Sequence, residues 1–366
     1  MNPSTPAAEK KVDLRSLAHG EILALVKALG EKPFRAKQLF RWLHQKNAAA
    51  FAEMTDLPAT LRASLADRYD LTTLTKDYEQ RSVDGTIKFR FTTADGKALE
   101  SVFMPSEKRN TLCISTQVGC AMGCTFCMTA TMGLVRNLSP GEIVDQVHRV
   151  NRELLAMGLP GPRPLTNLVF MGMGEPLHNF ENLKVALDIL LHEDGPNFSH
   201  RHVTVSTVGL VNMIERFGNE TEVKLAISLN ATTDEQRAAM MPINKRWNIE
   251  ALMEACRNFP MRQGRRITFE YVLLKGVNDT DEDALRLAKL VNGVPAKVNL
   301  IPYNTNPGLG FESVLEGRAE QFRDILLSKN VTAVIRKNRG RDIAGACGQL
   351  VAPGRKNAAP PVEAPQ

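Results

Sequence analysis

The sequence predicts an α/β protein in which a parallel sheet is covered by helices and preceded by a small helical domain. Short apolar segments alternate with helical patterns from about residue 111 to residue 336. This alternation is typical of parallel sheets, because a crossover helix connects each pair of strands. Residues 14–69, by contrast, show only helical periodicity. The length of 366 residues fits about two domains, and an apolar content of 43% suffices for a large core.

The chain divides into five parts. Residues 1–13 and 352–366 are rich in proline, alanine and charge, and we expect both to be disordered tails. Neither tail carries an apolar signal segment, and no run in the chain approaches the ~18 apolar residues of a membrane span. We therefore expect a cytoplasmic protein with no membrane contact. Between the tails we expect a helical domain (14–80), a β-hairpin extension (81–105) and an α/β domain (106–351).

The helical domain begins with a helix that ends at Gly30, and Pro33 fits the first turn of the next helix. That second helix, over residues 33–46, carries an apolar stripe and an opposite polar side. The stripe consists of Ala36, Leu39, Phe40 and Leu43, and the polar side of Lys37, Gln38, Arg41 and Gln45. A third helix is expected over residues 57–69. The net charge of 46 − 40 = +6 favours a polyanionic partner such as RNA. The polar side is thus either an RNA-docking face or an ordinary solvated one.

The hairpin and the sheet follow in order. Residues 86–92 and 98–104 flank the turn Ala94-Asp95-Gly96, which predicts a β-hairpin. Helical patterns cover residues such as 142–157 and 180–192. The predicted parallel strands are 111–116, 166–171, 202–206, 223–229, 267–274, 297–302 and 332–336. Because parallel barrels carry their chemistry at the carboxyl ends of the strands, residues that follow these strands are candidate site residues.

The most informative segment follows the first of these strands: Cys120-Ala-Met-Gly-Cys124-Thr-Phe-Cys127. Cysteine thiolates hold iron–sulfur clusters, so three of them can ligate three irons of a [4Fe–4S] cluster and leave one iron open for a small molecule. A zinc site is an alternative, although Cys113 and His148 lie at unusual spacings for a fourth ligand. A disulfide is another, but disulfides rarely persist in the cytosol.

The C-x3-C-x2-C spacing matches the signature of radical S-adenosylmethionine (SAM) enzymes, and the neighbouring segments extend the match. The segments are 113–120 (CISTQVGC), 132–138 (MGLVRNL), 171–177 (MGMGEPL) and 345–350 (GACGQL). Together they closely resemble the RlmN family, bacterial radical SAM enzymes that methylate C2 of adenine in 23S ribosomal RNA and in transfer RNA. The resemblance covers residues 14–351. It implies an incomplete (β/α)6 radical SAM barrel that holds one [4Fe–4S] cluster on Cys120, Cys124 and Cys127.

The resemblance also implies the residues that bind SAM. Gly174 and Glu175, in the turn after strand 166–171, are expected to bind the amino group of the methionine part. The further SAM contacts that it implies are Ser206, Ser228, Leu229, Asn230 and Asn304. From the residues alone, the glycine-rich turn would more often be an ordinary connection between a strand and a helix. The polar residues at the strand ends would more often be helix caps.

A second pair of thiols lies outside the cysteine motif. Cys347 belongs to a glycine-rich segment (339–348) that follows the last predicted strand, and Cys113 precedes the motif by seven residues. Both are expected near the mouth of the barrel, where they would form a candidate redox pair. Cys256, on an amphipathic helix over residues 249–258, is expected to be buried and inert.

The resemblance gives this pair its chemistry. C2 of adenine is electron-poor, so it does not attack the methyl group of SAM directly. In the family, the thiolate of the residue matching Cys347 first takes a methyl group, which requires an ionised sulfur. A 5′-deoxyadenosyl radical from a second SAM then activates this methyl group for addition to C2. The residue matching Cys113 finally attacks the carrier sulfur, which frees the product and leaves a disulfide for external reduction.

Glu100 matches the proposed proton acceptor of the family. Strand alternation places it on the same face as Val102, which indicates a partly buried site where the pKa of a carboxyl group rises. Cys113 is the alternative acceptor, and an exposed surface carboxylate remains a third reading of Glu100.

The resemblance implies 23S ribosomal RNA and transfer RNA as partners, together with an electron donor such as flavodoxin or ferredoxin, and we expect a monomer. Two other functions remain open. Cfr-like enzymes share these motifs but methylate C8 of the same adenine, and no residue here decides between C2 and C8. An iron–sulfur RNA-binding sensor without catalysis is the other, but a sensor would not need Cys113, Cys347 and Glu100.

Overall fold

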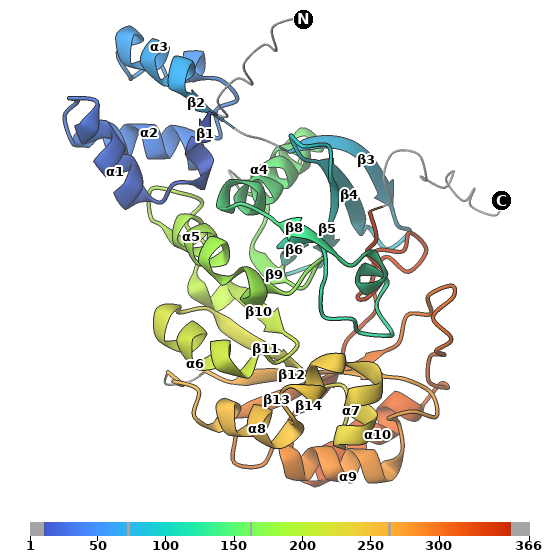
Figure 1. Ribbon diagram of the computed structural model, residues 1–366. Coiled ribbons are helices and arrows are strands. Elements are labelled where there is room, and N and C mark those ends of the chain that lie inside the picture. Colours follow the sequence, from blue (N-terminus) through green and yellow to red (C-terminus); the bar gives the residue numbers. More distant parts are fainter. Residues whose placement is uncertain (1–10, 72–73, 162, 263–264, 353–366) are drawn as a thin grey trace, which may run out of the picture.

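The computed structural model describes residues 11–71, 74–161, 163–262 and 265–352. It consists of a ten-stranded mixed sheet, helices that cover the sheet, and a helical N-terminal region at one end (Figure 1). Within these residues, no helix combines the length and the apolar character needed to cross a lipid bilayer.

The N-terminal region is closed by a two-stranded parallel sheet. Strand β1 (Val12–Asp13) pairs with β2 (Tyr69–Asp70), so the end of the predicted tail is ordered and the prediction of disorder there is wrong. Asp13 also accepts a hydrogen bond from the backbone of Arg15 and caps the short helix η1 (Leu14–Ser16). Residues 1–10 and 353–366 of the predicted tails lie outside the described residues, and Ala352 is buried.

Three helices follow η1 in this region, as predicted. They are α1 (His19–Ala28), α2 (Phe34–His44) and α3 (Ala59–Arg68), with a short helix η2 (Phe51–Glu53) before α3. The apolar stripe of α2 is confirmed, because Ala36, Leu39, Phe40 and Leu43 are all buried. Lys37 and Arg41 stand exposed on the opposite side. Lys37 forms an ion pair of 3.2 Å with Asp194 of the barrel domain.

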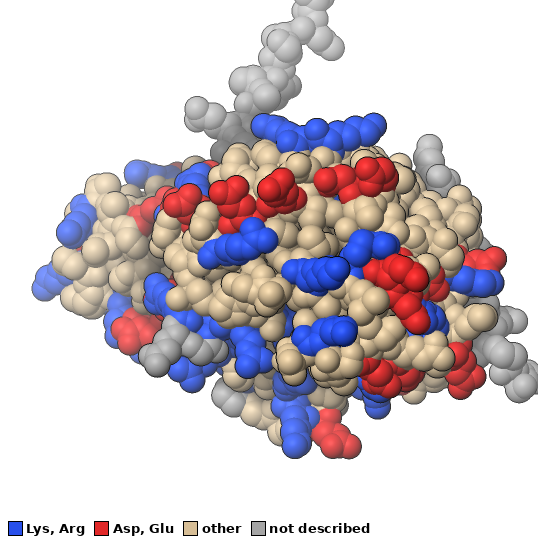
Figure 2. Space-filling view, turned by 90° about the horizontal axis from the view of Figure 1, so that it is seen from below, with Lys and Arg blue, Asp and Glu red and all other residues tan. Residues whose placement is uncertain are grey.

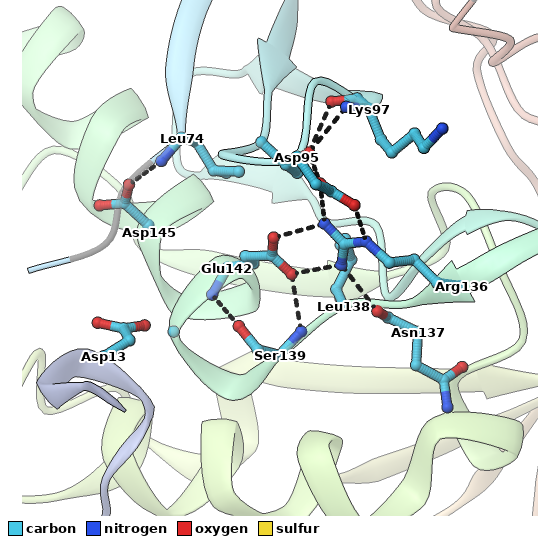
Figure 3. Close-up of polar contacts among 12 residues, drawn as sticks. Asp13, Leu74, Asp95, Lys97, Arg136, Asn137, Leu138, Ser139, Glu142 and Asp145 are labelled. Atoms are coloured by element: carbon cyan, nitrogen blue, oxygen red, sulfur yellow. Dashed lines mark hydrogen bonds and ion pairs between the residues drawn. The ribbon is translucent and has the colours of Figure 1, made fainter. Parts of the chain in front are cut away.

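Buried polar groups join the N-terminal region to the barrel. The Arg15 guanidinium donates to Asp145 Oδ1 at 2.5 Å and to the carbonyl oxygen of Ala48 at 2.7 Å. Asp145 Oδ2 accepts a hydrogen bond from the backbone N–H of Leu74 at 2.7 Å (Figure 3). Beside this pair, the rings of His44 and His148 approach to 3.4 Å between nitrogens. Burial lowers the pKa of both histidines well below its ordinary value, so both are neutral at pH 7.

The central sheet has seven parallel strands and an antiparallel extension. The extension consists of β3 (Thr75–Arg81), β4 (Ile87–Thr92) and β5 (Ala98–Pro105). The parallel strands are β6 (Asn110–Cys113), β9 (Asn167–Phe170), β10 (Val203–Thr207), β11 (Lys224–Ser228), β12 (Ile267–Leu273), β13 (Ala296–Pro302) and β14 (Ala333–Ile335). The order is β14-β13-β12-β11-β10-β9-β6-β5-β4-β3, and β5 pairs antiparallel with β6. The sheet is therefore open, with β14 and β3 at its two edges, in agreement with the predicted α/β fold.

Strand β3 was not expected, because it falls in the last residues of the predicted helical domain. Its alternating charged residues resemble a solvated helix face as much as a strand. In the structure β3 pairs with β4 as the outer strand of the sheet, where one side of a strand remains in solvent.

Helices cover the outer face of the parallel strands (Figure 1). They are α4 (Pro140–Ala156), α5 (Phe180–Leu191), α6 (Val211–Glu220), α7 (Asp234–Met240), α8 (Ile249–Arg257), α9 (Asp281–Leu290) and α10 (Arg318–Ser328). Cys256 is buried in α8, as predicted.

The start of α4 is fixed by a capping box and an arginine. Ser139 Oγ accepts from the backbone of Glu142, and the Glu142 carboxylate accepts from the backbone of Ser139. Arg136 donates to this carboxylate and also to Asp95 in the hairpin turn (Figure 3). This network ties the antiparallel extension to the first covering helix.

The chain leaves the sheet earlier than predicted at the cysteine motif. Strand β6 ends at Cys113, three residues before the predicted end. After it, β7 (Gln117–Gly119) pairs with β8 (Leu134–Asn137) and the two strands frame the motif as a separate hairpin. A glycine is required at position 119, because its φ is 74° and a Cβ atom there would lie 1.8 Å from the carbonyl oxygen of Gly133.

Charge is mixed on the face seen from below the view of Figure 1. Lysine and arginine side chains stand beside acidic ones across this face (Figure 2). The positive excess of the whole chain therefore does not make this face a purely basic surface.

Candidate active site

One cavity gathers most of the predicted site residues at the carboxyl ends of the parallel strands. They come from separate loops and strand ends, and only the fold brings them together. The predicted residues that line this cavity are Cys120, Cys124, Cys127, Gly174, Glu175, Ser206, Ser228, Asn230 and Cys347.

The three motif cysteines face this cavity as free thiols. Burial raises the pKa of Cys120 to about 12 and raises that of Cys124 well above its ordinary value. The neighbouring thiols raise these values further, since their negative charges would repel each other. Such a group of thiols remains protonated unless positive ions compensate it, so metal binding would displace their protons.

The three thiols can be compared with the ligand sets of a cluster and of a single metal ion. Within the described residues, no three His, Cys, Asp or Glu side chains stand together as ligands of one ion. Zinc would require ligands that converge on one point, whereas an iron–sulfur cluster takes one thiolate at each of several irons. Three thiols that line one cavity can each supply one such ligand.

The backbone holds the cysteine loop in place. Cys127 N–H donates to the carbonyl of Cys124, and Gly123 has a φ of 67°. Thr125 N–H donates to the carbonyl of Met240, at the end of α7. These contacts fix the loop from within and from the neighbouring helix.

Glu175 is a buried carboxylate with an oriented side chain. Its Oε1 accepts from the backbone of Leu177 at 3.0 Å, and Oε2 accepts from Val208 at 2.9 Å. Burial nevertheless raises its pKa to about 7. The preceding Gly174 has a φ of 99°, and a Cβ atom there would lie 2.6 Å from Gln117. The turn therefore needs a glycine and presents a carboxylate that a cation would stabilise in its charged form.

The other predicted SAM contacts divide into two groups. Ser206 and Ser228 border the cavity on neighbouring strands, with their hydroxyl oxygens 3.5 Å apart. Asn230 borders it as well and accepts a hydrogen bond from Val272 N–H at 2.9 Å. Leu229 and Asn304 are buried and do not belong to the described lining of this cavity. The Asn304 oxygen accepts from Arg341 at 2.9 Å, in the segment that carries Cys347.

Cys347 borders two cavities. It lines the cavity of the motif cysteines and also a second, smaller cavity lined by Cys113. Its side chain is accessible. The protein around the sulfur raises the pKa of the thiol by desolvation, and the Arg336 charge opposes that rise. Burial raises the pKa of Cys113 to about 12. Both are free thiols in the structure, so no disulfide joins the pair in this state.

The segment that carries Cys347 is held by the β3–β4 turn. Asp84 Oδ2 accepts from Gly340 N–H at 3.1 Å. In the opposite direction, Asp342 accepts from the Ser82 hydroxyl at 2.6 Å and from Val83 N–H at 3.2 Å. The antiparallel extension thus serves as a support for the cysteine-bearing segment.

Glu100 is buried, as its pairing with Val102 indicated. Its Oε2 accepts from Val351 N–H at 3.0 Å, and Oε1 lies 3.5 Å from Lys88 Nζ. Burial raises its pKa, and Lys88 opposes this rise. Glu100 does not belong to the described lining of either cavity, and its contact with the segment that carries Cys347 is the hydrogen bond from Val351.

Two charged residues in the site were not identified from the sequence. Arg336, directly after β14, lines both cavities. Glu270, in the middle of β12, is buried and lines the larger cavity. The available signal was a single charged residue within a largely apolar strand, Ile267–Leu273, whose apolar residues dominate the pattern.

Known proteins share both parts of this architecture. Residues 12–71 match the "Ribosomal RNA large subunit methyltransferase N-terminal domain", and residues 114–288 match the radical SAM superfamily. A "Dual-specificity RNA methyltransferase RlmN" of Anaeromyxobacter dehalogenans is 67% identical over 343 residues, which cover 93% of this chain and 92% of the relative. "Dual-specificity RNA methyltransferase RlmN 2" of Myxococcus xanthus is 65% identical, with 96% and 94% covered. The crystal structure of a radical SAM methyltransferase from Sphaerobacter thermophilus is 45% identical and superimposes with a TM-score of 0.87, covering 93% of this chain and 99% of that one.

Proposed function

Since this chain belongs to the RlmN family of radical SAM RNA methyltransferases, we propose that it methylates C2 of an adenine in 23S ribosomal RNA and in transfer RNA through a methyl group held on Cys347. The position of Cys347 carries this proposal. A methyl carrier must meet SAM and must later meet the thiol that releases the product, and Cys347 borders the cavities of both.

Cys120, Cys124 and Cys127 would hold the cluster, and Glu175 would bind the ammonium group of SAM. When bound, the [4Fe–4S] cluster supplies the electron that cleaves SAM reductively to a 5′-deoxyadenosyl radical. The apolar walls of the cavity keep water from this chemistry, with Phe170 and Ile301 in its lining. Ser206, Ser228 and Asn230 offer polar groups that orient the ligand on the strand ends.

The residues around Cys347 have distinct parts in the transfer. The Cys347 sulfur displaces S-adenosylhomocysteine from the methyl group of a first SAM, and the Arg336 charge favours the thiolate that this step needs. Cys113, which lines the smaller cavity with Cys347, would attack the Cys347 sulfur and release the methylated base. Either Cys113 or Glu100 accepts the proton from C2. Of these two, Cys113 lines a cavity and Glu100 supports the segment behind Cys347.

The same proposal covers the domains and partners. The helical region over residues 14–71 docks RNA, and the barrel carries the chemistry. The enzyme acts as a monomer in the cytoplasm and receives electrons from a small carrier such as flavodoxin or ferredoxin.

Mass spectrometry of nucleosides tests the reaction. RNA treated with the reconstituted protein, SAM and a reductant should contain 2-methyladenosine. Appearance of 8-methyladenosine would instead establish the C8 reaction of Cfr-like enzymes. Absence of any methylated adenine, with cluster and RNA both bound, would favour a sensor without catalysis.

A further inference from the structure

Glu270 presents an unused hydrogen-bond acceptor in the wall of the larger cavity. Its side chain is buried, and Oε1 accepts from Asn299 Nδ2 at 3.0 Å. Its Oε2 is shielded from solvent and has no hydrogen-bond partner among the described residues. A buried carboxylate oxygen without a partner is costly, so a ligand that donates a hydrogen bond to it would recover that free energy.

The position of Glu270 in the sheet places it among ligand-binding groups. Its register partner on β11 is Ser228, and its register partner on β13 is Asn299. Ser228 in turn lies beside Ser206 on β10. Four neighbouring strands thus contribute one polar row, and three of its members, Ser206, Ser228 and Glu270, line the same cavity.

The reaction determines which part of SAM reaches this row. On the proposed function, on which this inference rests, C5′ of SAM must meet the methyl group on Cys347. C5′ is bonded directly to the ribose ring, so the ring lies next to Cys347. Glu270 and Cys347 line the same cavity, and Glu175 in that cavity is assigned to the amino group of SAM.

We propose that Glu270 binds the ribose of SAM, with its free Oε2 accepting a hydrogen bond from a ribose hydroxyl group. Carboxylates hold ribose hydroxyls in the same way in dinucleotide-binding folds. Asn299 orients the carboxylate through Oε1, and the charge of Arg336 stabilises its ionised form. In this role Glu270 fixes the ribose so that C5′ points at Cys347.

A cycle of protein and ligand deletions tests this contact. Equilibrium dialysis would measure the Kd of SAM, 2′-deoxy-SAM and 3′-deoxy-SAM with anaerobically reconstituted holoenzyme. We expect Glu270→Gln to raise the Kd of SAM about 10- to 100-fold, the range for a hydrogen bond to a charged group. With the unchanged protein, the Kd of one deoxy ligand should exceed that of SAM by a similar factor. With Glu270→Gln, the Kd of that ligand should be little higher than the Kd of SAM.

Controls separate this contact from a loss of structure. Glu250→Gln, on the exposed surface of α8, should leave all three Kd values unchanged. Asn299→Ala should raise the Kd of SAM less than Glu270→Gln does, because the carboxylate remains. Iron content and the thermal unfolding midpoint of each variant show whether the cluster and the fold are retained. The deoxy ligands test the ribose contact in the unchanged protein, where no substitution can affect folding.

Either of two results would overturn the inference: a wild-type Kd for SAM in Glu270→Gln, or an undiminished loss of affinity for both deoxy ligands in that variant. A wild-type Kd together with slower transfer from premethylated Cys347 to RNA would assign Glu270 to the substrate adenine instead. Failure of the proposed function would look different, since it would appear as absence of 2-methyladenosine while the SAM contact persisted.

Discussion

Cys113 and Cys347 should act at different steps, because Cys347 borders both cavities whereas Cys113 lines the smaller one. Cys347→Ala removes the methyl acceptor, so neither 2-methyladenosine nor a protein–RNA adduct should form. Cys113→Ala leaves methylation and addition possible but removes the releasing thiol, so a nuclease-sensitive, shifted band should accumulate in denaturing electrophoresis. Cys256→Ala, at a buried thiol remote from this chemistry, is the matched control. Identical behaviour of the Cys113 and Cys347 variants would exclude the division of roles.

Glu175 should make SAM binding depend on pH. Burial raises its pKa to about 7, so the apo protein gains a proton there as the pH falls from 8 to 6. The ammonium group of SAM requires the ionised carboxylate, and this α-amino group itself loses its proton at a pKa of about 8. We therefore expect the affinity to be greatest between about pH 7 and 8 and to fall about tenfold per unit well below pH 7. Glu175→Gln should bind SAM weakly, and its affinity should not fall further as the pH is lowered below 7. A SAM affinity that stays constant from pH 6 to 7 in the unchanged holoenzyme would contradict the assignment.

At the scale of single elements, helix α2 carries the proposed RNA contact. Lys37 and Arg41 stand one turn apart on its exposed side, and the Lys37 charge is partly offset by Asp194. Lys37→Gln with Arg41→Gln removes both charges without placing an acidic residue beside Asp194. Because each phosphate contact contributes about −0.7 to −0.9 to the log–log salt slope, the slope should become shallower by about 1.4 to 1.8.

The matched control neutralises two lysines of the barrel domain, Lys289 and Lys329, which should leave the slope unchanged. SAM cleavage without RNA should be normal in both double variants. If RNA affinity and its salt dependence were the same in the α2 variant as in the unchanged protein, this side of α2 would be an ordinary solvated face.

The elements differ in how well their sequence predicted them. Six of the seven parallel strands were predicted to within one residue at each end, and β6 alone ends three residues early, because these strands read as short apolar runs between helical segments. The strands β3, β7 and β8 were not predicted, since they are short or lie at an edge of a sheet. Charged and small residues at such places are as compatible with a loop as with a strand. In the site, motif spacing located the three cysteines. Glu270 and Arg336 were not predicted as site residues. A single charged residue in or after a strand can be assigned to a site only when the sheet is known to bring it to a cavity.

At the scale of the molecule, the N-terminal region is attached through a buried ion pair. Arg15 and Asp145 are both almost fully shielded from solvent. Asp145→Ala leaves the Arg15 charge buried and uncompensated, which should lower the free energy of unfolding by about 3–5 kcal/mol. Urea unfolding measures this change. The exposed pair Arg318–Asp281 provides the control, as Asp281→Ala should cost less than about 1 kcal/mol. An equal effect of both substitutions would show that the buried pair does not secure this attachment.

The cysteine loop and the carrier segment share backbone contacts. Met128 N–H donates to the carbonyl of Gly348 at 2.8 Å, and the Thr129 hydroxyl donates to that of Leu350 at 2.7 Å. Oxygen that destroys the iron site and displaces the cysteine loop would therefore disturb two contacts of the segment that bears the methyl group, although its bonds to the β3–β4 turn would remain. Damaged enzyme should fail before it captures RNA rather than after, so air exposure would leave inactive protein but no stranded nucleic-acid adducts.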